Sequence, residues 1–176
     1  MSNNEESEKK AGGEETISKL LMLGAGPSEP EVRSMTIIGD VSEELSKDVI
    51  AALWFLKQTA KSEELVNPED PECEEVKEVI KPMEIIISTN GGSADDMFAI
   101  YDAMRYVRED VPVETFGLGK VMSAGTLLLA AGTKGQRRIG RHCRVMIHSV
   151  IGGSVGPMHQ LDNEMKEVKA IQEAYI

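Results

Sequence analysis

The sequence predicts a layered α/β fold with a mostly parallel sheet. Short segments rich in β-branched apolar residues alternate with longer segments whose apolar residues recur at helical spacing, a pattern typical of βαβ units. The chain has 176 residues, 41% of them hydrophobic, which suits one domain with a single core. We expect residues 1–33 to form an acidic, mostly disordered tail and linker, and residues 34–176 to form the folded domain.

The first half of this domain is expected to contain one strand and one helix. Residues 34–40 (SMTIIGD) have the composition of a short strand. Residues 42–60 are expected to form a helix, because Ser42 suits the N-cap, two glutamates follow it, and apolar side chains recur on one face. Residues 63–78 carry eight acidic residues against one lysine, together with two prolines, so we expect a solvated loop without a catalytic role.

Strands and helices alternate more regularly in the second half. Residues 83–88 (MEIIIS) form a continuous apolar run of the kind found in buried parallel strands. Ser93 and Asp96 make a capping-box pattern at the start of the next helix. The elements expected after residue 82 are a strand at 83–88, a helix at 94–110, a strand at 111–117, a helix at 123–132, a short strand within 135–140, a strand at 143–150 and a helix from 158 onward.

Charge and composition argue against several classes of function. The net charge of −11 argues against a nucleic-acid partner, because phosphate binding needs a basic surface. Cys73 and Cys143 have neither disulfide-scaffold nor metal-site spacing, so we expect free thiols and no metal. No apolar run approaches the roughly 18 residues of a membrane span, and the N-terminus lacks a secretory signal. We therefore expect a cytoplasmic protein that does not bind membranes.

Three segments at strand ends contain groups that could carry chemistry. Gly91 and Gly92 lie between a strand and a helix, where backbone N–H groups can approach a ligand closely. Ser123 follows the strand at 111–117 and begins an apolar helix, so its hydroxyl can be presented in front of the helix N–H groups. His148 follows the apolar run CRVMI, near the sheet edge where ligands bind in open α/β folds.

Each of these features also has a plain structural explanation. The glycine pair can be a tight turn, Ser123 can be an N-cap or a small packing residue, and His148 can be a hydrogen-bonded structural histidine. The other two histidines, His142 and His159, are expected to be exposed and without function. Taken together, however, a candidate nucleophile, a candidate base and hydrogen-bond donors at neighbouring strand ends form the constellation that acyl transfer needs.

Two segments carry a specific resemblance to a known family. Residues 87–138 (ISTNGG to GQRR) and residues 144–156 (RVMIHSVIGGSVG) resemble the proteolytic subunit of Clp protease (ClpP), a family of serine peptidases with a layered ClpP/crotonase-like fold. The resemblance implies that Ser123 is the nucleophile and His148 the general base. It also implies an oxyanion hole formed by the backbone N–H groups of Gly92 and Ala124, and an extended peptide substrate held by two glycine-rich strand segments. The residues of those segments are Gly91, Gly92, Ser93, Ile151, Gly152 and Gly153.

The resemblance also has implications for assembly. The last helix, from about Pro157, resembles the family's handle helix, through which two heptameric rings meet and enclose a chamber where unfolded polypeptides are cut. ATP would be used only by a partner AAA+ unfoldase, so no cofactor is expected in this subunit. The family's third catalytic residue, an aspartate, follows the handle helix. No residue of this chain matches it, Asp162 included, so we expect a domain truncated at its C-terminus.

The unmatched aspartate leaves a second hypothesis open, which is a catalytically weak or inactive structural subunit that co-assembles with an active paralogue. A third hypothesis, an acyl-CoA enzyme of the same fold, is disfavoured by the matching Ser123 and His148. The acidic tail and the acidic segment 63–78 both depart from the family's usual pattern for docking an unfoldase.

Overall fold

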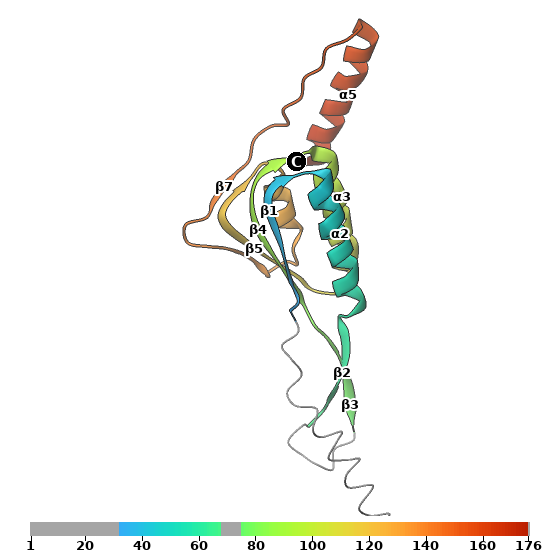
Figure 1. Cartoon of the computed structure of the whole chain (residues 1–176), viewed down its shortest axis with the longest axis vertical. Coiled ribbons are helices and arrows are strands. Elements are labelled where there is room, and N and C mark those ends of the chain that lie inside the picture. The colour runs from blue at the N-terminus through green and yellow to red at the C-terminus, as the bar shows by residue number, and fades with distance from the viewer. Residues whose placement is uncertain (1–31, 68–74, 176) are drawn as a thin grey trace, which may run out of the picture. The chain divides into compact units, whose positions relative to one another are not determined.

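The computed structural model describes residues 32–67 and 75–175. The expected tail at 1–33 lies almost wholly outside this range, and the residues from Arg33 onward form one compact unit. The elements of that unit are, in order, β1 (Ser34–Val41), α2 (Glu43–Gln58), β2 (Lys61–Leu65), β3 (Val76–Ile80), β4 (Met83–Gly92), α3 (Ala94–Val107), β5 (Val113–Met122), α4 (Ala124–Ala131), β6 (Arg137–Ile139), β7 (Arg144–Met146) and α5 (Met158–Tyr175) (Figure 1).

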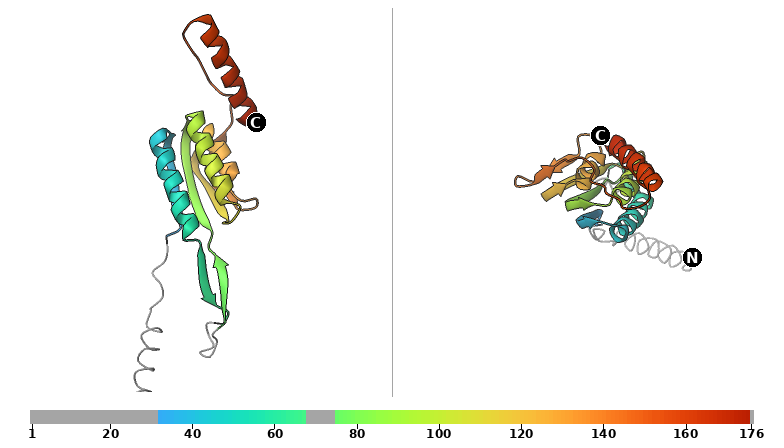
Figure 2. Two further views of the ribbon diagram at one scale, coloured as in Figure 1. Left: turned by 90° about the vertical axis from the view of Figure 1, so that its right-hand side faces the viewer. Right: turned by 90° about the horizontal axis from the view of Figure 1, so that it is seen from above.

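A parallel sheet forms the centre of the unit. Its strands follow the order β1-β4-β5-β6, and β7 pairs with the C-terminal part of β5. All of these pairs are parallel, so the carboxyl ends of the strands lie at one edge of the sheet. Helices α2 and α3 lie side by side against the sheet (Figures 1 and 2). The layered α/β fold predicted from the alternation of apolar patterns is therefore confirmed.

Side chains from the helices and the sheet fill a common core. Ser42 caps α2, as predicted, by accepting a hydrogen bond from the Leu45 N–H at 3.4 Å. Ser93 caps α3 by accepting one from the Asp96 N–H at 3.3 Å, but its own N–H donates to the Val41 carbonyl, so only half of the predicted capping box forms. The two helices are joined by a hydrogen bond of 3.1 Å from the Ser46 hydroxyl to Asp96. The largest fully buried side chains are Ile37, Leu53, Met83, Ile85, Ile87, Ile100, Met104 and Leu128.

The acidic segment differs from the prediction. The strands β2 and β3 form an exposed antiparallel ribbon on either side of residues 68–74, which are not described. Across the ribbon, Lys61 pairs with Glu78 at 3.1 Å. The prediction of a loop was therefore wrong for the residues in these strands. It failed because neither face of the ribbon is well buried, so the sequence lacks the apolar alternation that marks a half-buried strand.

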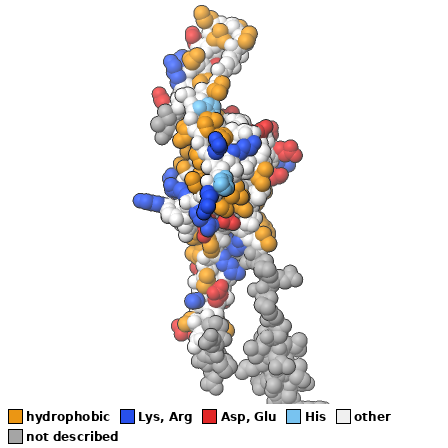
Figure 3. Space-filling view, turned by 90° about the vertical axis from the view of Figure 1, so that its left-hand side faces the viewer, with side chains coloured by type: hydrophobic (Ala, Val, Ile, Leu, Met, Phe, Trp, Pro, Cys, Tyr) orange, Lys and Arg blue, Asp and Glu red, His pale blue; other side chains and the backbone are white. Residues whose placement is uncertain are grey.

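The segment around His148 also differs from the prediction. β7 covers Arg144–Met146 only, and residues 147–157 contain no strand, so the expected strand at 143–150 and the peptide-binding strand at 151–153 are corrected. The apolar residues here do not enter the core: Ile147 is 73% exposed and Ile151 84% exposed. On the β7 side of the molecule, exposed apolar side chains lie next to Lys and Arg side chains (Figure 3).

Helix α5 ends the described chain and buries none of its described residues. Met158 and Met165 are among its exposed apolar side chains. Its last turns contact the rest of the unit: the Gln172 side chain accepts a hydrogen bond from the Val150 N–H at 2.7 Å, and Tyr175 packs against the core. This position suits the handle helix expected from the resemblance. Within the described ranges, no helix combines the length and apolarity needed to cross a membrane.

Candidate active site

Ser123 lies in a sharp turn between a strand and a helix. β5 ends at Met122 and α4 begins at Ala124, with Ser123 between them at φ 52° and ψ −123°. Among the described residues, it is the one non-glycine residue with positive φ. Such a conformation costs on the order of 1–3 kcal/mol and persists where the surroundings enforce it. Its hydroxyl makes no capping hydrogen bond to α4, so the explanation of Ser123 as an N-cap is not supported. A strained strand-to-helix turn is also how nucleophilic serines are exposed in hydrolases.

Hydrogen bonds on both sides of Ser123 hold this turn. Its N–H donates to the Met146 carbonyl at the end of β7, at 2.9 Å. Its carbonyl accepts from the Thr126 N–H at 2.9 Å, from the Thr126 hydroxyl at 2.7 Å and from the Tyr175 hydroxyl at 2.9 Å. The backbone of Ser123 is therefore fixed to β7, to its own helix and to α5.

Gly91, the first residue of the glycine pair, packs directly against Ser123. A Cβ atom on Gly91 would lie 2.5 Å from the Ser123 Cβ and 3.0 Å from its hydroxyl oxygen, and Gly91 has φ 99°. A Cβ atom on Gly92 would overlap the backbone of Val41. The Thr89 side chain orders this segment, because its oxygen accepts from the Gly91 N–H at 2.9 Å and its hydroxyl donates to the Gly39 carbonyl. Gly91 is thus required for β4 to approach the Ser123 turn so closely, and Gly92 for β4 to approach Val41 of β1.

His148 reaches the same place from the neighbouring strand. The pairing of Met122 with Met146 aligns the ends of β5 and β7, and His148 follows two residues later. Its side chain is half-buried. Within residues 32–67 and 75–175, no carboxylate forms a hydrogen bond or ion pair with the His148 ring. Asp162 lies on the exposed early part of α5, away from the cavity that His148 lines.

A cavity of about 420 Å³ connects these groups. Its wall is formed by Asn90, Gly92, Ser93, Ala94, Met97, Ser123, Ala124, His148, Ser149, Val150, Ile151, Ile171 and Tyr175. It therefore brings together six residues singled out in the sequence, namely Ser123, His148, Gly92, Ala124, Ser93 and Ile151. The remaining three lie elsewhere: Gly91 lies behind the Ser123 side chain, and Gly152 and Gly153 line a second cavity beside α5.

The electrostatic character of the cavity suits a developing negative charge. The first residues of α3 and α4, Ala94 and Ala124, both line it. A helix N-terminus presents N–H groups without intrahelical acceptors and carries a partial positive charge. Among the described residues, the wall contains no carboxylate side chain that would oppose an anion. The arrangement can therefore stabilise an oxyanion formed in front of Ser123.

Cys143 is a weaker candidate for a nucleophile than Ser123. It is half-buried, and burial raises the pKa of its thiol, which disfavours the reactive thiolate. Cys73 lies outside the described residues. The described residues also contain no cluster of His, Cys, Asp or Glu that could hold a metal ion.

Two residues of the site carried no signal in the sequence. Thr126 and Tyr175 both bind the Ser123 carbonyl, and Tyr175 also lines the cavity. Thr126 is the one polar side chain in the apolar run TLLLAAG, and Tyr175 lies 52 residues away from Ser123 on a helix of its own. The spacing of residues in the sequence does not indicate such a contact.

Comparison with protein families is consistent with this geometry. A family model described as Clp protease matches residues 73–176, which is more than half of the chain. The matched range includes every residue of the cavity wall.

Proposed function

The chain belongs to the Clp protease family, and on this premise we propose that it is a serine endopeptidase in which Ser123 is the nucleophile and His148 the general base. The observation that carries the proposal is the positive-φ turn that places Ser123 in a cavity lined by His148 and by two helix N-termini. The two structural explanations of Ser123, an N-cap or a small packing residue, do not account for its strained backbone. A packing serine would gain nothing from a conformation this costly.

The proposed reaction passes through an acyl-enzyme. The Ser123 oxygen attacks the carbonyl carbon of the scissile peptide while His148 takes the hydroxyl proton. The oxyanion accepts hydrogen bonds from the Gly92 and Ala124 N–H groups. The C–N bond then breaks as His148 returns the proton to the leaving amine. Water attacks the resulting ester, His148 takes a proton from the water and gives it to Ser123, and the free acid leaves.

Substrate binding is proposed to depend on the peptide backbone rather than on charge. Of the side chains that the structure describes in the cavity wall, His148 and Tyr175 are the two titratable ones, and Met97, Val150 and Ile171 add apolar surface. A segment of unfolded polypeptide could lie extended beside the end of β4 and the segment after His148. Neutral and apolar side chains next to the scissile bond should therefore be preferred to acidic or basic ones.

The assembly proposed for this chain follows its family, whose members generally form oligomeric rings and work with unfoldases. Heptameric rings, two of them stacked, would cover the exposed apolar side chains of α5 and of the β7 side (Figure 3). In this proposal ATP is used by an AAA+ unfoldase and the subunit itself needs no cofactor. The cytoplasmic location stays a prediction from the sequence.

A fluorogenic short peptide with an apolar residue before the scissile bond tests the proposal. We expect turnover by the assembled chain, loss of turnover in Ser123→Ala and His148→Ala, and little change in His142→Ala and Ser88→Ala, which alter side chains outside the cavity. Slow turnover is expected where no carboxylate orients His148, as among the described residues, because a triad without its aspartate loses on the order of 10⁴ in kcat. Turnover that persists in Ser123→Ala would overturn the proposal.

One observation favours a second candidate function. Because no carboxylate among the described residues orients His148, the chain could instead serve as a structural subunit beside an active paralogue. Native mass spectrometry of the assembled particle, combined with the peptide assay, separates the two candidates. A pure homo-oligomer that cleaves the peptide excludes the structural role. Hetero-oligomers in which Ser123→Ala leaves the activity unchanged support it.

A further inference from the structure

Three oxygen atoms form a closed triangle behind the Ser123 turn. The Tyr175 hydroxyl lies 2.9 Å from the Ser123 carbonyl oxygen, the Thr126 hydroxyl lies 2.7 Å from the same carbonyl, and the two hydroxyls lie 2.7 Å apart. Two hydroxyl hydrogens are available for these three contacts. Because the carbonyl can only accept, at least one hydroxyl donates to it in every arrangement that uses both hydrogens within the triangle.

This carbonyl belongs to the same peptide group as the Ala124 N–H. A trans peptide group is planar and its C=O and N–H bonds point in opposite directions. Holding the Ser123 carbonyl on one side therefore directs the Ala124 N–H to the other. Ala124 is the first residue of α4 and lines the cavity, and its N–H is one of the two donors in the proposed oxyanion hole.

We propose that Tyr175 is a positioning residue for oxyanion stabilisation, acting through the peptide group that joins Ser123 to Ala124. The inference rests on the proposed function of Ser123. The Tyr175 hydroxyl, together with Thr126, keeps this peptide group from rotating and thereby holds the Ala124 N–H toward the reacting carbonyl. Donation to the carbonyl also polarises the peptide group, which makes its N–H a better donor.

The position of Tyr175 in the fold gives this role a physical reason. The Ser123 turn is strained, so it relaxes unless hydrogen bonds hold it on both sides. The Thr126 N–H and hydroxyl supply local bonds, whereas Tyr175 supplies the bond from a separate helix. Tyr175 is half-buried, although α5 has no fully buried residue, so this end of the helix is fixed against the active site.

Steady-state kinetics and the affinity of a peptide boronate test the inference, since a boronate forms a tetrahedral adduct with a nucleophilic serine. In Tyr175→Phe we expect kcat to fall by about threefold to tenfold, as for the loss of one neutral hydrogen bond, with KM unchanged. Boronate affinity should weaken by a similar factor. A non-cleavable peptide that makes only ground-state contacts should bind equally well to both proteins.

Two sets of variants separate positioning from simple tethering of α5. Thr126→Val should lower kcat as Tyr175→Phe does, Thr126→Ser should restore it, and the double variant should lose less than the product of the single effects, because the hydroxyls bind each other. Tyr101→Phe is the matched control, since Tyr101 also packs against the core and its hydroxyl contacts Arg105 on α3. It should leave kcat and boronate affinity unchanged.

The outcomes distinguish failure of this inference from failure of the proposed function. If the wild-type chain turns over peptide through Ser123 and Tyr175→Phe matches it in kcat and boronate affinity, the positioning role alone is overturned. The same conclusion follows if Tyr175→Phe raises KM or lowers the melting temperature at constant kcat. That result would mean that the Tyr175 hydroxyl only holds α5 against the rest of the unit. If neither turnover nor boronate binding depends on Ser123 in the wild type, the proposed function is overturned and the inference with it.

Discussion

At the residue scale, the contact between Gly91 and Ser123 decides how the nucleophile is presented. The space that a Gly91 side chain would occupy is already filled by the Ser123 Cβ, 2.5 Å away, and by the Met122 carbonyl oxygen, 3.0 Å away. Neither neighbour is the end of a flexible side chain that could move aside. A side chain at position 91 must therefore displace the Ser123 turn itself.

Gly91→Ala is expected to reduce peptidase kcat/KM by about 100-fold, the loss that a displacement of roughly 1 Å can cause in an active site. Gly135→Ala is the matched control, because Gly135 has a similar φ of 87° and open space around it. It should lose about 1–2 kcal/mol of stability to backbone strain and keep its activity. Equal activities of the two variants, measured on folded protein, would contradict this account of the site.

Much of the candidate site could be predicted from the sequence. In a parallel sheet the carboxyl ends of strands share one edge, so the glycine pair, Ser123 and His148 could be expected to meet there. Tyr175 could not be predicted, because its contact depends on the path of residues 147–157, which form no regular structure. The φ of Ser123 was equally inaccessible, because serine carries no sequence signal for positive φ.

At the scale of elements, a charged and aromatic contact joins α2 to α3. Trp54 stacks on Tyr106 with ring centroids 5.4 Å apart, and the Lys57 amine lies 3.7 Å from the centre of the Tyr106 ring. Lys57 also pairs with Asp110 at 2.7 Å. This pairing lowers the pKa of the Asp110 carboxyl and raises the pKa of the Lys57 amine.

The lowered pKa of Asp110 has a consequence for stability. The native state favours the ionised carboxylate, so the contribution is present above the unfolded pKa of about 3.9 and disappears as the pH falls through the lower folded value. Asp110→Asn should therefore lower the melting temperature slightly at pH 7, and the difference from wild type should close below pH 4. Asp102→Asn, an exposed substitution on α3, is the control. A difference that stays constant from pH 7 to below the folded pKa would argue against the pair.

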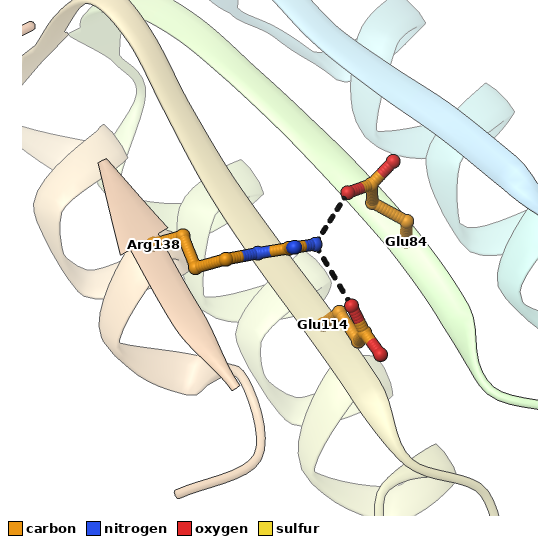
Figure 4. Close-up of polar contacts among 3 residues, drawn as sticks. All are labelled: Glu84, Glu114 and Arg138. Atoms are coloured by element: carbon orange, nitrogen blue, oxygen red, sulfur yellow. Dashed lines mark hydrogen bonds and ion pairs between the residues drawn. The ribbon is translucent and has the colours of Figure 1, made fainter. Parts of the chain in front are cut away.

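A second polar contact crosses three strands of the sheet. The Arg138 side chain on β6 binds Glu84 on β4 at 2.8 Å and Glu114 on β5 at 2.9 Å (Figure 4). Its guanidinium group also lies 5.6 Å from the centre of the Phe116 ring. Because β6 has only three residues, these side-chain contacts supplement its backbone pairing with β5.

Arg138→Met is expected to lower the free energy of unfolding by about 0.5–1 kcal/mol, because it removes the positive charge that lies between the Glu84 and Glu114 carboxylates. The loss is small because both ion pairs are partly exposed. Urea unfolding at low salt measures this loss, which should shrink in 1 M salt, where screening is strong. Arg141→Met, an exposed arginine outside the cluster, should change stability much less. A loss that does not depend on salt would assign the effect to packing on Phe116 instead.

Elements with a buried face could be predicted from their apolar pattern, whereas the exposed β2–β3 ribbon could not. The strands and helices that fill the core, such as β4 and α3, have clear apolar periodicity. The β2–β3 ribbon is exposed on both faces, so its backbone hydrogen bonds form without a matching side-chain pattern. The apolar run that continues past β7 led to the opposite error. It predicted a strand, but its apolar side chains remain exposed in the single chain and form none.

At the scale of the whole molecule, the parallel sheet and its helices position the cavity, and membership of the Clp protease family supports our proposal that peptide hydrolysis takes place there. The βαβ alternation sufficed to predict this layered architecture. The position of α5 could not be predicted from its apolar pattern, because none of its described residues is fully buried, although Tyr175 packs against the core. In the proposed account that helix both meets other subunits and fixes the Ser123 turn.

The most direct test of the central claim is covalent labelling of the assembled chain with a fluorophosphonate, followed by mass spectrometry of the digested protein. We predict one adduct, on Ser123, that is absent in Ser123→Ala, strongly slowed in His148→Ala and unchanged in His142→Ala. Absence of an adduct on Ser123, or labelling at an undiminished rate in Ser123→Ala, would contradict the assignment of Ser123 as the nucleophile.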